Sequence, residues 1–188
     1  MNIYDPYPDS VEINGEKIPL DLAYDHVLMA LDVLVMYEMT LYDRIETACI
    51  LLLKYPDIHL PKDINGMTAL LNAIMALFPK AEQTEKVIDF HQDAAMIRSA
   101  FFRIGIDLSK DKINFFQFLE LLSDLPKDTA LMRVIDIRTR PLPMVTNENR
   151  EQVAELQRMK QKVAIKLSDE ERMRNFARSL KKSSLLRG

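Results

Sequence analysis

Two short alternating runs near the start of the chain precede a long series of helical patterns. In "VEINGEKIPL" (residues 11–20), apolar and polar residues alternate on both sides of Asn14-Gly15. An Asn-Gly pair favours a tight hairpin turn, because both residues accept the positive φ that this turn requires. The pattern therefore predicts a β-hairpin over residues 11–20.

From Asp21 onward, apolar residues recur three and four positions apart, which is the spacing of one helix face. Thr40, Asp21 and Asp128 are suited to cap helices, Ser168 with Glu171 forms a capping box, and Pro56 and Pro79 are expected to end helices. The stretch "PDIHLPKDINGMT" after Tyr55 is predicted to be a loop. Helices are predicted over residues 21–39, 40–55, 67–78, 87–105, 113–125, 128–139, 145–167 and 168–188. The fold class is thus mainly α: a multi-helix domain with a short N-terminal hairpin and a C-terminal helical tail.

Charge is unevenly distributed and changes sign near residue 140. Residues 1–140 carry 14 basic and 22 acidic side chains, whereas residues 141–188 carry 11 basic and six acidic ones. Pro141 and Pro143 interrupt the helical pattern at the same place. We therefore expect a helical body over residues 1–140, followed after a Pro-containing linker by a basic helical tail over residues 141–188. Two parts of opposite charge are expected to contact different partners.

Composition favours a soluble protein with a packed core. Apolar residues make up 48% of the 188 residues, and the one cysteine, Cys49, lies in an apolar run. Cys49 therefore reads as a core residue, and a single cysteine fits a reducing cytoplasm. The first residues show no signal-peptide pattern, and every apolar run is shorter than the roughly 20 residues of a membrane span. An intracellular protein with no membrane partner is expected.

The stretch "DLSKDKINFFQFLELL" (residues 107–122) has the alternating oxygen ligands that begin a calcium loop. Such a loop requires Gly at its sixth position and Glu at its twelfth. Counted from Asp107, these positions hold Lys112 and Phe118. We therefore expect a polar loop without a metal, in which Ser109 or Asp111 helps to start the next helix.

Catalytic patterns are missing from the sequence. His26, His59 and His91 have no second His or Cys at metal-ligand spacing. His91 and Asp93 could form a base–carboxylate pair, but a solvated helix face is the preferred interpretation. Phosphate loops, nucleophile elbows and paired catalytic carboxylates are not found. The sequence predicts a non-enzymatic protein without a cofactor.

A set of phenylalanines falls in two consecutive predicted helices, at residues 101, 102, 115, 116 and 118. Helices 87–105 and 113–125 are expected to pack as a hairpin with these rings between them. Core packing is the favoured role. Because Phe115 and Phe116 cannot share one helix face, one ring is also expected to reach a partner. The aromatic candidates for partner binding are Phe101, Phe115, Phe116 and Phe118.

The basic tail supplies the second set of candidates for partner binding: Arg172, Arg174, Arg178, Lys181 and Lys182. Clustered cations bind nucleic acid by releasing counterions from phosphates. Here, however, acidic residues are interleaved with the basic ones or precede them, an order that also complements a helix dipole. A protein partner is the preferred interpretation, and nucleic acid stays an alternative.

An ordered series of short motifs runs through residues 89–138. Its members are Asp89-Phe90, Asp93, Ala100-Phe101, Ile106-Asp107-Leu108, Phe118, Leu121-Leu122, Leu125, Asp128-Thr129, Ile135 and Arg138. Together with the N-terminal "YPDSVEINGEKIPLDL", this order resembles a protein family of long-tailed phages of Gram-positive bacteria, over roughly residues 8–140. Two positions depart from the family pattern. Ile18 stands where an aromatic residue is usual, and Asn114-Phe115-Phe116 stands for His followed by two Trp.

The resemblance implies a tail assembly chaperone, encoded between the major tail protein and the tape-measure protein. Such a chaperone binds the tape-measure protein, keeps it soluble, recruits tail-tube subunits and is absent from the mature virion. The implied partners are the tape-measure protein, the major tail protein, and a second chaperone subunit or further copies of the chain. The implied location is the host cytoplasm. Two alternatives stay open: a nucleic-acid-binding regulatory protein that uses the basic tail, and a minor structural protein of the virion tail.

Overall fold

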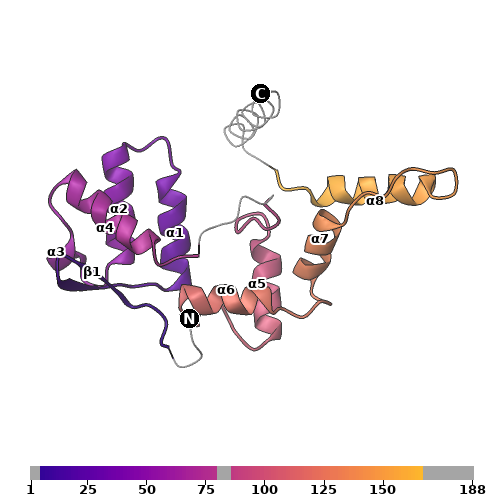
Figure 1. The fold of residues 1–188 in the computed structure, drawn as a ribbon. Helices are drawn as coiled ribbons and strands as arrows, with labels where there is room; N and C mark the ends of the chain where they lie inside the picture. The colour runs from indigo at the N-terminus through magenta and orange to yellow at the C-terminus, as the bar shows by residue number, and fades with distance from the viewer. Residues whose placement is uncertain (1–4, 80–85, 167–188) are drawn as a thin grey trace. The chain divides into compact units, whose positions relative to one another are not determined.

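Helices make up most of the regular structure in the computed structural model, which describes residues 5–79 and 86–166 (Figure 1). The mainly α prediction, with an N-terminal hairpin, is confirmed. The elements in chain order are β1 (Ser10–Ile13), β2 (Glu16–Pro19), α1 (Tyr24–Leu34), α2 (Leu41–Leu52), α3 (Pro56–His59), α4 (Ile64–Met75), α5 (Ala94–Arg103), α6 (Phe115–Ser123), α7 (Ala130–Thr139) and α8 (Arg150–Val163). Within the described ranges, no helix combines the length and apolarity needed to cross a membrane.

The predicted hairpin is present. Strands β1 and β2 pair antiparallel, with Val11 opposite Ile18, and both side chains are buried. Asn14 and Gly15 have φ angles of 54° and 82°, the left-handed values that the tight turn requires. The local turn chemistry alone was therefore enough to locate this element.

Contacts along the backbone divide the described chain into two units. Unit 1 contains residues 5–79 and 101–125, and unit 2 contains residues 86–100 and 126–166. Helix α5 contributes residues to both. The predicted boundary near residue 140 was based on charge, and it stays a prediction.

Unit 1 is built on α2, which packs against both α1 and α4. Its core includes Cys49, Leu70 and Ile74, none of which has measurable exposure. Cys49 is thus a core residue, as its apolar neighbours indicated. Burial raises the pKa of its thiol to about 11, so the group stays protonated and unreactive at neutral pH.

The observed helix starts confirm one predicted cap residue and contradict another. Thr40 caps α2 as predicted, since its side chain accepts a hydrogen bond from the backbone of Asp43. The prediction for Asp21 was wrong, because α1 begins at Tyr24. The segment before it is extended: Leu20 bridges to Leu53, and Ala23 bridges to Asn114. These pairings to distant residues delay the helix. The carboxylate of Asp21 instead accepts a hydrogen bond from the backbone of Ala23 and lies 3.1 Å from Nδ1 of His26.

Other predicted boundaries also moved. Thr129, not its neighbour Asp128, caps α7. The predicted loop after Tyr55 contains α3, which begins at Pro56, and the start of α4, which is capped by Asp63. Pro is favoured in the first turn of a helix as well as after its end, so its helix-starting role was missed. The predicted helix 21–39 ends at Leu34, because the chain must reverse before Thr40 for α2 to pack on α1.

The predicted aromatic packing between α5 and α6 is present within unit 1. Phe101 stacks on Phe118 with ring centroids 5.0 Å apart, and Tyr24 of α1 stacks on Phe118 at 5.1 Å. Phe78 meets Phe115 edge-on at 5.4 Å. Sequence analysis did not include Tyr24 or Phe78 in this group. The rings therefore join α6 to the rest of unit 1 as well as to α5.

Substitutions at two adjacent phenylalanines can test this packing. Phe101 has no exposure, whereas the Phe102 side chain is 69% exposed. We predict that Phe101→Ala lowers the free energy of unfolding by about 3–5 kcal/mol, through lost burial and the cavity it leaves. Phe102→Ala should change it by no more than about 0.5 kcal/mol. Urea unfolding followed by circular dichroism measures both values. Equal losses for the two variants would contradict the packing.

Candidate partner-binding surfaces

The aromatic candidates all lie in the core of unit 1. Phe101, Phe115, Phe116 and Phe118 are buried, and Phe102 is the exposed ring of the original set. Partner contact by these four rings stays a prediction. The basic candidates, Arg172, Arg174, Arg178, Lys181 and Lys182, lie outside the described residues, as does the predicted helix 168–188 with its capping box.

The loop after α5 is closed by its own side chains. The carboxylate of Asp107 accepts hydrogen bonds from the backbone and hydroxyl of Ser109, and that of Asp111 accepts one from the backbone of Asp107. Hydrogen bonds from Ser109 and the ammonium of Lys110 hold the pKa of Asp107 below its usual range. The predicted helix-starting role of Ser109 or Asp111 was wrong, because Asn114 caps α6. Among the described residues, no cluster of metal-ligating side chains is found.

The turn between α1 and α2 exposes a run of apolar side chains, here called the turn surface. It consists of Val35, Met36, Tyr37, Leu41 and Tyr42, each between 41% and 62% exposed. Contiguous exposed apolar groups of this kind commonly mark interaction sites. Sequence analysis assigned Val35–Tyr37 to a helix and missed the surface. In the sequence, the apolar Leu41 and Tyr42 directly after the cap residue Thr40 were the one sign of this surface.

The turn surface is held in shape by hydrogen bonds at both of its ends. The backbone amides of Val35 and Met36 donate to Asp32 and Val33, which closes the end of α1. Arg44 of α2 donates to the carbonyl of Leu34 at 3.2 Å, and its guanidinium lies 5.4 Å from the centre of the Tyr37 ring. The apolar side chains are therefore presented on an ordered turn, which reduces the entropy cost of binding.

A second exposed apolar run lies in unit 2, between α7 and α8. Leu142, Met144 and Val145 are all exposed, Met144 by 90%. The amide of Asn149 donates to the carbonyl of Met144 and fixes the following turn. We call these three residues the linker surface. A run of exposed apolar side chains is thus present in each unit.

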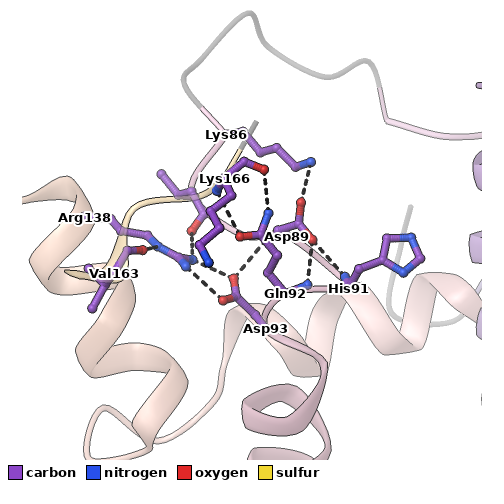
Figure 2. A network of polar contacts seen from close by, with 9 residues as sticks. Lys86, Asp89, His91, Gln92, Asp93, Arg138, Val163 and Lys166 are labelled. Carbon is purple, nitrogen blue, oxygen red and sulfur yellow. Dashed lines mark hydrogen bonds and ion pairs between the residues drawn. The ribbon is translucent and has the colours of Figure 1, made fainter. Parts of the chain in front are cut away.

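A buried polar network organises unit 2 (Figure 2). At its centre, two nitrogens of the Arg138 guanidinium donate to the two carboxylate oxygens of Asp93, at 2.6 Å and 2.9 Å. Two further hydrogen bonds reach backbone carbonyls: Nε donates to Val163 and Nη1 also donates to Val87. One side chain of α7 therefore connects the segment before α5 with the end of α8.

Asp89 and Gln92 extend the network. The carboxylate of Asp89 accepts hydrogen bonds from the backbone of His91 and Gln92 and from the ammonium of Lys86. The side-chain amide of Gln92 exchanges two hydrogen bonds with the backbone of Lys166, each 2.9 Å long. Figure 2 shows these contacts around the segment that precedes α5. They explain why α5 begins only at Ala94, seven residues after the predicted start.

Electrostatics in the network favour ionised carboxylates. Burial alone would raise the pKa of Asp93, but hydrogen bonds from Arg138 and from the backbone of Asp89 outweigh it and lower that pKa. The pKa of Asp89 is also lowered, since its bonds to Gln92, Lys86 and His91 outweigh its burial. The prediction that Asp93 lies on a solvated helix face was wrong, because its side chain is 1% exposed. The arrangement is a structural clamp, in which each of the three guanidinium nitrogens of Arg138 has an acceptor.

Comparison with known proteins gives the family. The sequence pattern of the family described as Bacteriophage Gp15 protein matches residues 3–165. The chain belongs to this family. The match includes the turn surface, Asp93 and Arg138, and it ends one residue before Lys166, the last residue of the network. The expected phage origin is thereby confirmed, whereas the family description names no activity. Neither a curated protein nor a solved structure matches the chain.

The Asp93–Arg138 pair generates a stability prediction. Arg138→Met should lower the free energy of unfolding of unit 2 by about 3–5 kcal/mol, because it leaves the Asp93 carboxylate buried without its partner. Arg140→Met is the matched control. It breaks the exposed pair with Asp136 on the same helix and should cost no more than about 1 kcal/mol.

A double variant separates loss of the pair from loss of the fold. Asp93→Leu combined with Arg138→Met removes both charges and should recover at least about half of the loss seen for Arg138→Met alone. Urea unfolding monitored by hydrogen exchange in α7 and α8 measures each value. A double variant as unstable as the single one would show that charge pairing is not what stabilises the network.

The lowered pKa values of Asp89 and Asp93 set a direction for pH dependence. Groups with a lowered folded-state pKa stabilise above their unfolded value, which is about 3.9 for Asp. This contribution disappears as pH falls through the folded-state pKa. We predict that the stability of unit 2 falls as pH drops from about 5 toward 2, and falls less in Asp89→Asn, which has one titrating group fewer. Chemical unfolding at stepped pH tests this, and an unchanged pH slope in the variant would contradict it.

Proposed function

We propose that this phage protein is a tail assembly chaperone that binds the tape-measure protein, keeps it soluble and helps to recruit tail-tube subunits. It acts as a non-catalytic binding protein in the host cytoplasm and is not retained in the mature virion. Membership of a bacteriophage family supports the phage setting. The motif series over residues 89–138 supports the tail-assembly role, because its order resembles chaperones encoded beside the tape-measure protein.

The turn surface is the observation that carries this proposal. A long helical tape-measure protein exposes apolar stripes before the tube surrounds it, and a chaperone must cover them. Met adapts its shape to irregular partners, and Tyr combines apolar area with a polar end. Met36, Tyr37 and Tyr42 supply both properties on an ordered turn. Such a surface suits helical stripes of varied sequence.

The proposed role also requires release as the tube polymerises. A surface of five partly exposed side chains favours weak binding by each copy. Several copies bound along one long client would gain avidity from repetition without strong individual contacts. The linker surface, in the other unit, is available for a second partner, which we assign to the major tail protein. Weak sites in two units suit a protein that must transfer its client to tube subunits.

Co-expression tests the proposal. The tape-measure protein encoded beside this chain is expressed alone, with the wild-type chain, and with variants, and its soluble fraction and co-purification are measured. We predict that the wild-type chain makes it soluble in a multi-copy complex. The combined change Met36→Ser and Leu41→Ser should reduce recovery by about tenfold or more, since two partly buried apolar contacts are lost.

Ile58→Ser is the matched control for this experiment. Ile58 is 75% exposed on α3 of the same unit, but it lies outside the turn surface. It should leave recovery within about twofold of wild type. The proposal fails if the tape-measure protein stays insoluble with the wild-type chain, if the chain is found in purified virions, or if it binds nucleic acid in a salt-sensitive way instead.

A further inference from the structure

The segment that forms the turn surface carries an excess of negative charge. Between residues 32 and 46 the chain has one basic side chain, Arg44, and four acidic ones: Asp32, Glu38, Asp43 and Glu46. Its formal net charge is therefore 1 − 4 = −3. The guanidinium of Arg44 donates to the carbonyl of Leu34 and lies beside the Tyr37 ring. That one cation thus holds the turn together, and the segment stays acidic.

Three of these carboxylates lie beside the exposed apolar side chains. Glu38 directly follows Tyr37 in the turn, and Asp43 directly follows Tyr42; both acidic residues are exposed. The hydroxyl of Tyr42 donates a hydrogen bond to the carboxylate of Glu46 at 3.4 Å. The charge of Glu46 raises the pKa of that hydroxyl above its ordinary value, and the charge of Asp43 adds to the effect. A negative field therefore borders the apolar groups.

A second copy of the chain fits this surface poorly. In a two-fold symmetric dimer, the same patch lies on both sides of the interface. Glu38 and Asp43 of one copy would then lie close to the same two carboxylates of the other copy. Like charges brought together across an interface oppose binding. The acidic border therefore disfavours self-association through the turn surface and favours a partner of opposite charge.

We propose that the turn surface binds a cationic amphipathic helix, in which Lys or Arg side chains flank an apolar stripe. Apolar contact supplies the attraction, and cations placed near Glu38 and Asp43 determine which helices bind and in which orientation. This inference rests on the proposed function in identifying the client as the tape-measure protein. It adds the charge that the bound stripe must carry, so that the surface selects the basic stripes of a long helical client.

Two synthetic helical peptides test this preference. Both carry the same stripe of Leu and Met at helical spacing, flanked only by Lys in one peptide and only by Glu in the other. Binding to the full-length chain is measured by fluorescence anisotropy. In about 0.1 M salt we expect the Lys-flanked peptide to bind at least about tenfold more tightly than the Glu-flanked one. In about 1 M salt this ratio should fall at least about threefold, because charges are then screened within about 3 Å.

Charge reversal on the turn surface separates a local effect from the net charge of the chain. Glu38→Lys should weaken binding of the Lys-flanked peptide by about fivefold or more and strengthen binding of the Glu-flanked one. Glu38→Gln should cause a smaller change in the same direction. Glu12→Lys is the matched control, because Glu12 is exposed on β1 and its reversal alters the net charge equally. It should leave both affinities within about twofold of wild type.

The control position is remote from the turn surface. The hairpin that contains Glu12 leads to Leu20, which bridges Leu53 just beyond the end of α2, whereas the turn surface lies at the start of α2 (Figure 1). The combined change Met36→Ser and Leu41→Ser should weaken binding of both peptides by about tenfold, since it removes the apolar contacts that they share. Circular dichroism checks that each variant keeps its helices.

Three results would overturn the inference. The first is equal affinity for the two peptides, and the second is equal weakening by Glu38→Lys and Glu12→Lys. The third is self-association of the chain that the Met36→Ser and Leu41→Ser change abolishes, since a second copy would then occupy the surface.

Failure of the proposed function would look different. A tape-measure protein that stays insoluble in co-expression removes the proposed client, but the peptides still show whether the surface prefers cationic helices. Conversely, the tape-measure protein could become soluble through the turn surface while the two peptides bind equally. That result would support the chaperone role and overturn the charge preference.

Discussion

The guanidinium of Arg138 imposes a constraint on which unit 2 depends. Arginine stays charged at every relevant pH, so its burial is tolerated only when its donors are satisfied. Here the acceptors come from three places in the chain: the carboxylate of Asp93, the carbonyl of Val87 and the carbonyl of Val163. The segment before α5, the last turn of α7 and the end of α8 must therefore take up their positions together. Helices α7 and α8 also pack on each other, and Leu131, Val153 and Leu156 on these helices are buried.

Sequence reasoning succeeded where a local signal was decisive. Asn14-Gly15 located the hairpin, Thr40 located the start of α2, and the aromatic spacing located the packing of α5 on α6. It failed where distant residues set the local conformation. Asp21 lost its capping role because Ala23 pairs with Asn114, about 90 positions away in the chain. Asp93 was assigned to solvent because nothing in its neighbourhood indicates Arg138, which lies 45 residues later.

A signal for the network was nevertheless present. Asp89, Asp93 and Arg138 stand at the two ends of the motif series that suggested a phage family. The order of the motifs alone did not explain why these positions hold two aspartates and an arginine. The structure supplies the reason, because the three side chains meet in one buried cluster. The turn surface had a weaker signal, since an apolar run in a predicted helix is expected to be buried. Its exposure follows from the chain reversal between α1 and α2, which only the packed helices reveal.

Buried charge and exposed apolar groups are each unfavourable unless something compensates them. In unit 2 the compensation is internal, since each of the three guanidinium nitrogens of Arg138 has an acceptor within the unit. At the turn surface of unit 1, Val35, Met36 and Leu41 are exposed, and under the proposed function the compensation comes from the bound tape-measure protein.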